Sequence, residues 1–414
     1  MAGLTLDTID ILTPDLYVER GYPHEEWALL RREAPVYWYQ RDNCDPFWAI
    51  TKHADIITVS RQPGLFRSTQ RLFVAINEPG VPPPEEALLR QLLNMNPPEH
   101  GAYRAVVSRR FTPAAVSKLA GHVQEIAAQL IEGIADREQC DFVTDVSAKL
   151  PLAVISEMFG IPRSDWEMMF RLSNAMIGAT DPEYMRGGTI MEGLQQARME
   201  FFEYFSQLVA DRRKNPRDDL ATALALGRVN GEEIPPFELL SYFALLIIAG
   251  NETTRNATTG GLYALMNNPD QWEMLKRDPS LNRTAAEEII RWTSPVIQFM
   301  RVATADTELR GQKIREGDAL ALYYPSANRD EEVFEEPFKF DVRRHPNYHL
   351  AFGIGEHYCL GANLARLELQ MIFREIAARM DCVELAGPIS RMRSSFVGGI
   401  KHMPIRYKMR PKAA

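Results

Sequence analysis

The sequence predicts a mainly α-helical protein with small β-sheets, and three features support that fold class. Apolar residues recur at helical spacing over about residues 113–213. A single long helical segment begins near Pro235-Pro236, where proline suits a first turn, and runs to a break at residues 267–270 (NNPD). The β-rich segments between the helices are few and short.

The first predicted sheet is a hairpin of residues 35–40 (PVYWYQ) and 46–51 (PFWAIT) around the turn RDNCD. The helical region that follows contains breaks at Asp141, at 160–162 (GIP) and at 180–182 (TDP), so several successive helices are expected. After the long helix we expect a helix ending near Trp292, β-segments at 298–304 and 319–324, and a last helix starting just after Cys359.

Composition excludes several classes of protein. The chain has 414 residues, 45% hydrophobic and 25% charged, which predicts a sizeable core rather than disorder. A net charge of −8 argues against general binding to nucleic acid. The most apolar segment, 239–250, falls short of the roughly 20 residues that span a bilayer, and no signal peptide is visible. Four cysteines without CxxC pairing suit a reducing cytosol, so we expect a cytoplasmic protein without a membrane anchor.

The most informative segment is HLAFGIGEHYCLGANLAR, residues 349–366, which places three glycines around Cys359 and then opens a helix. Glycines let the backbone turn tightly beside a flat cofactor, and backbone N–H groups at a helix N-terminus stabilise a thiolate. Two alternatives exist for Cys359. It could be a small buried hydrophobe, or it could join His357 in a zinc site, although no neighbouring side chains supply the remaining ligands.

This segment resembles the haem-binding signature of the cytochrome P450 family. The resemblance implies the P450 fold, with haem b lying between the long central helix and the helix after the cysteine loop. It also implies that Cys359 ligates the iron and that Phe352, Gly353 and Gly361 contact the haem. No flavin or ferredoxin-like module is present, so residues 1–414 are expected to form a single catalytic domain without a fused reductase.

Further motifs resemble those of the family. Glu288 and Arg291 match the ExxR element, which implies a structural brace completed by Arg343 or Arg344. His100 and Arg104 match the residues that hold the haem propionates, with Asn96 replacing the usual aspartate. Arg301 and His357 match the other propionate partners. On their own, such charged pairs would be ordinary surface features.

The long helix carries AGNETT at 249–254, where polar groups interrupt a strongly apolar stretch. The family resemblance implies that Glu252 relays protons and that Thr253 is the hydroxyl beside the reacting oxygen. The alternative is a helix bend with satisfied polar groups and no chemistry. Asn251 stands where many relatives carry a nonpolar residue or histidine.

The predicted activity is that of a monooxygenase that hydroxylates a lipophilic small molecule, such as a steroid, terpenoid or branched lipid. It would use O2 and electrons from a separate ferredoxin and ferredoxin reductase. Alternatives are a haem-thiolate peroxygenase or isomerase, or a non-catalytic haem-based sensor. Further substrate contacts are expected from the loop 72–82 and the Met-containing helices of 168–191, although any of these residues could simply be core. The named substrate contacts are Leu245, Ala249, Val296, Phe299 and Val397.

Overall fold

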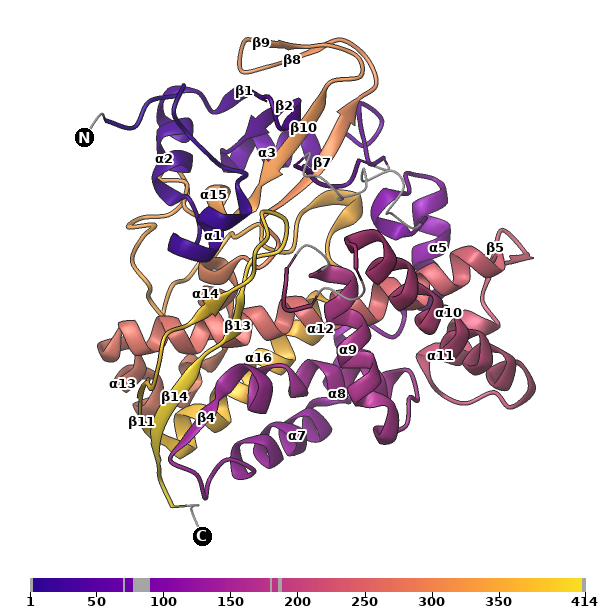
Figure 1. The fold of residues 1–414 in the computed structure, drawn as a ribbon, viewed down its shortest axis with the longest axis vertical. Coiled ribbons are helices and arrows are strands. Elements are labelled where there is room, and N and C mark those ends of the chain that lie inside the picture. The colour runs from indigo at the N-terminus through magenta and orange to yellow at the C-terminus, as the bar shows by residue number, and fades with distance from the viewer. Residues whose placement is uncertain (1–2, 70, 77–89, 179–180, 185–187, 412–414) are drawn as a thin grey trace.

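Helices carry most of the chain in the computed structural model, which describes residues 3–69, 71–76, 90–178, 181–184 and 188–411 (Figure 1). The predicted long helix is α12 (Pro236–Asn267), which crosses the middle of the helical part of the molecule. Proline occupies its first turn, where no intrahelical donor is needed, and α13 (Pro269–Arg277) begins directly after its end. The predicted helix and both of its boundaries are therefore confirmed.

The helices that pack against α12 include α8 (Lys149–Met158), α14 (Asn282–Thr293) and α16 (Ala362–Arg379). They share one large hydrophobic core. The predicted helices ending near Trp292 and starting after Cys359 are α14 and α16. The other helices are α1 (Pro14–Arg20), α2 (His24–Glu33), α3 (His53–Ser60), α5 (Glu99–Ser108), α6 (Pro113–Ser117), α7 (Ala120–Glu132), α9 (Trp166–Ile177), α10 (Ile190–Lys214), α11 (Leu220–Ala225) and α15 (Tyr324–Ala327).

Local sequence explains where several helices begin and end. Thr189 caps α10 by accepting a hydrogen bond from the Glu192 backbone N–H at 3.2 Å, while Glu192 accepts one from the Thr189 N–H at 3.1 Å. The predicted break at Asp141 is the end of a short strand, and the break at 160–162 separates α8 from α9. At the third break, Asp181 and Pro182 lie between α9 and α10, while Thr180 is outside the described residues. Short helical turns complete the helical part: η1 (Leu92–Asn94), η2 (Val143–Ser147), η3 (Arg163–Asp165), η4 (Pro279–Leu281) and η5 (Gly355–His357).

The main sheet has the strand order β1-β2-β10-β7-β3. Its hairpin, β1 (Val36–Arg41) with β2 (Cys44–Ile50), is the predicted one, and β10 (Ala319–Tyr323) and β7 (Gln298–Ala303) are the two predicted later segments. The strand β3 (Phe66–Arg67) pairs with the edge of β7. Every residue of β10 is buried, as suits a central strand.

A second sheet joins distant parts of the chain, with β14 (Pro404–Met409) between β11 (Met380–Leu385) and β4 (Gln139–Asp141). The remaining strands form two-stranded pairs: β5 (Arg228–Val229) with β6 (Glu232–Glu233), β8 (Thr307–Leu309) with β9 (Gln312–Ile314), and β12 (Ser390–Arg391) with β13 (Ile400–His402). The mainly α fold class with small sheets is confirmed.

Within the described ranges, no helix combines the length and apolar character needed to cross a bilayer.

Candidate active site

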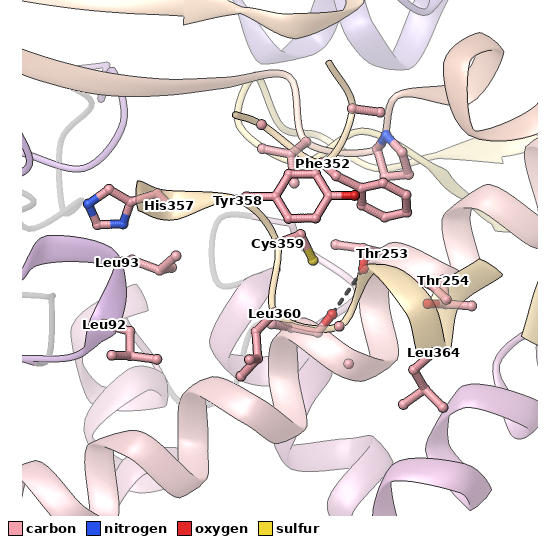
Figure 2. Close-up of a pocket in the computed structure, with 18 of the residues that line it drawn as sticks. Leu92, Leu93, Thr253, Thr254, Phe352, His357, Tyr358, Cys359, Leu360 and Leu364 are labelled. Carbon is pink, nitrogen blue, oxygen red and sulfur yellow. Dashed lines mark hydrogen bonds between the residues drawn. The ribbon is translucent and has the colours of Figure 1, made fainter. Parts of the chain in front are cut away.

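A cavity of about 230 Å³ is lined by α12 and by the loop that carries Cys359 (Figure 2). Figure 2 shows Cys359, from the loop, and Thr253, from α12, facing this space. The cavity brings together most of the residues singled out from the sequence, although they come from separate segments. These are His100, Arg104, Leu245, Ala249, Thr253, Val296, Phe299, Arg301, Phe352, Gly353, His357, Cys359 and Gly361.

One predicted catalytic residue and one predicted substrate contact do not line the cavity, and neither do the structural residues Glu288 and Arg291. Val397 is buried and pairs with Val296 in an isolated β-bridge, so it is a neighbour of a lining residue. Glu252 is fully buried within α12 packing. Of the loop 72–82, Leu72 lines the cavity, while residues 77–82 lie outside the described residues. No described methionine of 168–191 lines it.

The cysteine loop is shaped by two glycines with left-handed backbones, Gly353 (φ +66°) and Gly355 (φ +76°). A Cβ on Gly355 would meet the carbonyl oxygen of Ser60 at 2.6 Å, so the loop packs tightly against the end of α3. The Cys359 N–H donates to the Phe352 carbonyl at 2.9 Å and closes the loop. This local geometry fixes the position of Cys359 at the cavity.

The Cys359 thiol is subject to opposing influences. Burial raises its pKa, and the backbone N–H groups of Gly361 and Ala362 oppose that rise by hydrogen bonding to the sulfur. The guanidinium groups of Arg104 and Arg366 also lower it. Donors and positive charge directed at a half-buried sulfur suit a thiolate that binds a metal cation.

Four basic side chains gather at one side of the cavity: His100, Arg104, Arg301 and His357. The His100 and His357 rings lie 4.4 Å apart, and His357 Nε2 is 3.1 Å from the Ser68 hydroxyl. Within the described part of the chain, none of the four forms an ion pair with a carboxylate, and His100 Nδ1 is buried without a hydrogen-bond partner. Burial and, after it, the charges of Arg301, His100 and Arg104 together lower the pKa of His357 to about 2. The cluster is therefore suited to an anionic ligand.

The acid predicted to relay protons is held away from the cavity. Glu252 forms an ion pair with Arg255, and Asn251 Nδ2 donates to Glu252 Oε1 at 3.4 Å. Arg255 in turn donates to Asn174 Oδ1 of α9 at 2.8 Å. Burial raises the pKa of Glu252, and Arg255 partly offsets that rise. Thr253 does reach the cavity, and its hydroxyl donates to the Ala249 carbonyl at 2.9 Å (Figure 2).

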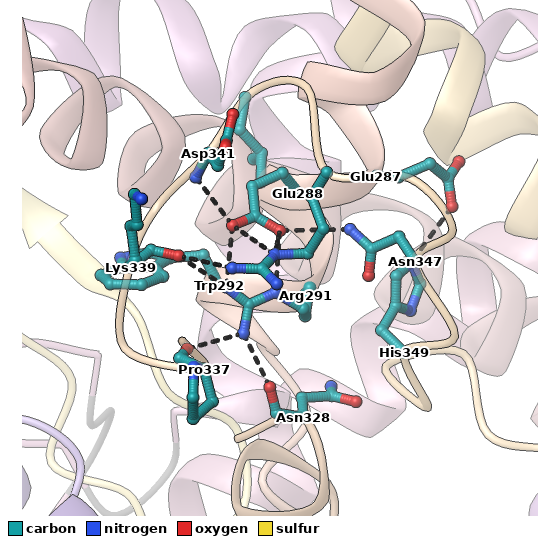
Figure 3. A network of polar contacts seen from close by, with 12 residues as sticks. Glu287, Glu288, Arg291, Trp292, Asn328, Pro337, Lys339, Asp341, Asn347 and His349 are labelled. Carbon is teal, nitrogen blue, oxygen red and sulfur yellow. Dashed lines mark hydrogen bonds and ion pairs between the residues drawn. The ribbon is translucent and has the colours of Figure 1, made fainter. Parts of the chain in front are cut away.

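Glu288 and Arg291 form a fully buried ion pair on α14, with Arg291 Nε and Nη2 each donating to the carboxylate at 2.8 Å (Figure 3). Arg344, and not Arg343, completes the brace, since it lies 3.2 Å from Glu288, whereas Arg343 pairs with Asp341. Arg291 also donates to the Asn328 carbonyl, and Asn328 Oδ1 accepts the Leu350 N–H. The network thus reaches the start of the cysteine loop.

Comparison with known proteins decides the family. The family model described as Cytochrome P450 matches residues 88–279 and 270–381, which is more than half of the chain. The chain belongs to the cytochrome P450 family. This P450 is 39% identical to the steroid C26-monooxygenase of Rhodococcus jostii over 96% of this chain and 84% of that protein. It is 37% identical to the linalool 8-monooxygenase of Pseudomonas putida over 96% and 98% of the two chains.

Solved structures agree with this assignment. The Mycobacterium marinum cytochrome P450 CYP268A2 in complex with pseudoionone matches with a TM-score of 0.89 and 33% identity, covering 98% of this chain and 100% of that chain. CYP108D1 from Novosphingobium aromaticivorans matches with a TM-score of 0.87 and 34% identity over 97% of each chain. The P450 fold predicted from the cysteine loop is confirmed, and this P450 is a monooxygenase by class.

Family membership implies a haem-iron cofactor, and the cavity fits one. Cys359 supplies a sulfur ligand, Arg104 and Arg301 supply positive charge and His100 and His357 supply ring N–H donors for two propionates, and the remaining walls are mostly apolar. A Cβ on Gly361 would meet nothing within 4 Å, which leaves open space beside the cysteine. No group of three metal-ligating His, Cys, Asp or Glu side chains occurs in the described ranges, so His357 and Cys359 have no further zinc ligands there.

The sequence did not predict several residues of the site, and two polar ones among them are Ser68 and Glu368. Ser68 contacts His357, and nothing in its own sequence context indicates this. Glu368 of α16 lines the cavity. A signal for Glu368 did exist, because it lies four residues after Leu364 and therefore on the same helix face as a residue of the cysteine signature.

Proposed function

We propose that residues 1–414 form one catalytic domain that binds haem b through Cys359 and hydroxylates a lipophilic small molecule. O2 would be the oxidant, and a separate ferredoxin with its reductase would supply two electrons. The observation that carries this proposal is the placement of a half-buried cysteine, in a glycine-shaped loop, in an apolar cavity that also holds a cluster of basic side chains without a carboxylate partner among the described residues. When bound, a haem with a thiolate ligand activates O2 so that one oxygen atom enters substrate and the other leaves as water.

The protein residues would hold the cofactor in distinct ways. Cys359 would supply a thiolate ligand to the iron, and the Gly361 and Ala362 N–H groups would stabilise the charge on its sulfur. Phe352 and Gly353 line the cavity and would contact the haem. His100, Arg104, Arg301 and His357 would bind the propionates. Glu288 and Arg291, with Arg344, would brace this arrangement from α14 without touching the cofactor.

We assign proton delivery to Glu252 and Thr253. The structure adds a condition that the sequence does not reveal, which is that Glu252 must first separate from Arg255. The carboxylate of Glu252 pairs with Arg255, so it must leave that ion pair before it can pass a proton toward the cavity. Thr253 already lines the cavity. Its hydroxyl can give up its hydrogen bond to the Ala249 carbonyl and donate to a group inside the cavity instead.

The substrate is inferred from the cavity walls and from the relatives. Leu245, Ala249, Val296 and Phe299 present apolar surface, and Val397 is a neighbour of Val296. Relatives are named for steroid, linalool and methyl-branched lipid oxidation. A steroid, terpenoid or branched lipid is accordingly the proposed substrate class.

The proposed ferredoxin has a limited basic surface to bind. Arg109 is exposed, and Arg104 donates to the Tyr358 carbonyl at 2.7 Å beside the cysteine loop. Arg110 pairs with Asp218, and Arg366 pairs with Glu287, so these two arginines add little net charge. Because Arg104 is assigned to a haem propionate, we expect Arg109 to carry most of the attraction for an acidic partner.

Isotope labelling tests the proposed activity. The protein is combined with a ferredoxin, its reductase and NAD(P)H, and candidate steroids and terpenoids are chosen by the spin-state shift that they induce in ferric haem. The proposal predicts one 18O atom from 18O2 in the hydroxylated product and none from labelled water. Turnover with peroxide alone would favour a peroxygenase, conversion without oxygen incorporation an isomerase, and tight binding without electron uptake a sensor.

A further inference from the structure

Ser68 is a buried polar residue that links two separate segments beside the basic side chains of the cavity. It follows strand β3 directly and is only 3% exposed. Its N–H donates to Asn96 Oδ1 at 2.9 Å, and its carbonyl accepts from Asn96 Nδ2 at 2.7 Å. Its hydroxyl lies 3.1 Å from Nε2 of His357, a residue of the cavity wall (Figure 2). Every polar group of Ser68 thus has a partner, which defines the position of this residue.

The two hydrogen bonds between Asn96 and Ser68 require an amide side chain. The Ser68 N–H is a donor and the Ser68 carbonyl is an acceptor, so their partner must offer both an oxygen and an NH2 group. An ionised aspartate at position 96 would offer acceptors alone, and one carboxylate oxygen would lie against the Ser68 carbonyl oxygen. Asn96 replaces the aspartate usual in the family motif, and it therefore makes a contact that an aspartate cannot make.

Asparagine at position 96 also adds no negative charge beside the basic cluster. The Asn96 carbonyl accepts the His100 N–H at 2.9 Å, and Ser68 connects the Asn96 side chain to His357. Over the described ranges, neither these two histidines nor Arg104 and Arg301 form an ion pair with a carboxylate. An aspartate at position 96 would bring a negative charge close to this cluster and weaken its attraction for an anionic ligand.

We propose that Asn96 and Ser68 are positioning residues for the haem: the Asn96 amide holds the backbone of Ser68, and the Ser68 hydroxyl holds the His357 ring at the cavity wall. The inference rests on the proposed function, which assigns His357 to a haem propionate. Neither Asn96 nor Ser68 lines the cavity, so both act through His357. They keep its ring in place for the cofactor and keep negative charge away from the propionates.

The test compares Asn96→Asp with Asn43→Asp, a control that adds the same charge at an exposed residue in the turn between β1 and β2. The rate of haem transfer from each haem-bound protein to excess apomyoglobin measures how firmly the cofactor is held. Asn96→Asp should release haem about tenfold faster than wild type, because it loses a hydrogen bond and adds an opposing charge. Asn43→Asp should release haem at the wild-type rate. Wild-type release by Asn96→Asp overturns the proposal.

Ser68→Ala tests the link to His357 separately, because it removes the hydroxyl and keeps the backbone contact with Asn96. It should release haem about fivefold faster than wild type. It should also shift the propionate bending band in the resonance Raman spectrum, which a general loss of stability would not do. In a His357→Phe background, Ser68→Ala should have no further effect on release, because the residue through which it acts is gone. An unshifted band in Ser68→Ala, or an additive effect in that background, overturns the assignment.

The wild-type protein separates this inference from the proposed function. A wild type that binds no haem, or that lacks the thiolate band in its reduced, carbon-monoxide-bound spectrum, contradicts the proposed function itself. A normal thiolate band, together with unchanged haem release in Asn96→Asp and Ser68→Ala, contradicts only the roles of these two residues.

Discussion

Buried charges in this P450 are stabilised by specific partners. The neighbouring residues Arg343 and Arg344 allow a direct comparison, because only Arg344 contacts Glu288. Arg344 has a side chain only 12% exposed, contacts Glu288 and donates to the Lys339 carbonyl, whereas Arg343 is 58% exposed and pairs with Asp341 alone. Removing one partner of a buried network leaves a charge uncompensated. We predict that Arg344→Ala lowers the free energy of unfolding by about 3 kcal/mol. Arg343→Ala should cost under about 1 kcal/mol. Denaturant titration of both variants measures this, and equal losses would contradict the assignment.

The ion pair of Glu252 with Arg255 predicts strong coupling between these two residues. Arg255→Met leaves the Glu252 carboxylate buried without its cation, which should raise the pKa of Glu252 further and destabilise the fold by about 3 kcal/mol. The double variant Glu252→Gln, Arg255→Met should cost less than the sum of the single changes. A double-mutant cycle by denaturant unfolding measures the coupling, and additive losses would show that the pair is not formed in solution.

These residues also show what sequence alone can predict. Apolar flanks predicted that Glu252 is a buried polar position, whereas the structural role of Glu288 and Arg291 was predicted from the family resemblance, because the spacing alone is typical of a surface pair. All three side chains are buried. The sequence could not choose between Arg343 and Arg344, since adjacent residues outside a helix differ only by backbone direction. Nor could it predict that Glu252 pairs along its own helix, because the position of Arg255 depends on Asn174 of α9.

At the scale of the element, the glycines of the cysteine loop have two different roles. One allows the backbone to fold, and another leaves room in the cavity for the haem. Gly355 has a positive φ and abuts the Ser60 carbonyl, whereas Gly361 has neither constraint and faces the cavity. We predict that Gly355→Ala lowers the free energy of unfolding by about 2 kcal/mol. Gly361→Ala should leave apoprotein stability nearly unchanged and reduce haem occupancy. Thermal unfolding and haem titration distinguish the two, and a destabilised Gly361→Ala apoprotein would contradict this division.

A charged contact ties the segment between α9 and α10 to the C-terminal strands. His402 of β13 bonds to Asp141 and, at 2.7 Å, to Glu183, while Lys401 bonds to Asp181 at 2.8 Å and to Glu183 at 2.9 Å. Burial lowers the pKa of His402, but the hydrogen bonds and charges of both carboxylates outweigh it, so the net pKa is raised. Its stabilising contribution is therefore full below an unfolded pKa of about 6.5 and is lost as pH rises through the folded value.

His402→Gln tests this contact through the pH dependence of stability. The difference in unfolding free energy between wild type and variant should be largest at mildly acidic pH and shrink under alkaline conditions. A difference that stays constant with pH would show that protonation of His402 does not stabilise the fold.

Elements were predictable where the local sequence determines their ends. The prolines at its start and the NNPD break at its end predicted both ends of α12. The two β-rich segments on either side of a polar turn predicted the β1–β2 hairpin. The sheet of β11, β14 and β4 was not predicted, because β4 is only three residues long and its partner lies at the far end of the chain.

For the whole molecule, the chain folds so that segments far apart in sequence meet at one cavity. Residues near 100 supply basic groups, α12 supplies the threonine wall, and the C-terminal part supplies the cysteine loop and α16. The family could be predicted from the sequence because its cysteine signature is continuous. The lining could not be predicted in full, because Glu368 and Val397 depend on how α16 and the C-terminal segment pack.

The central claim is that Cys359 binds the haem iron as a thiolate, and the difference spectrum of the reduced, carbon-monoxide-bound protein tests it most directly. Cys382→Ser, which alters an exposed cysteine, serves as the control for Cys359→His. The account predicts a long-wavelength Soret band in wild type and Cys382→Ser and its loss in Cys359→His. A band that persists in Cys359→His, or a wild-type protein that binds no haem, would contradict it.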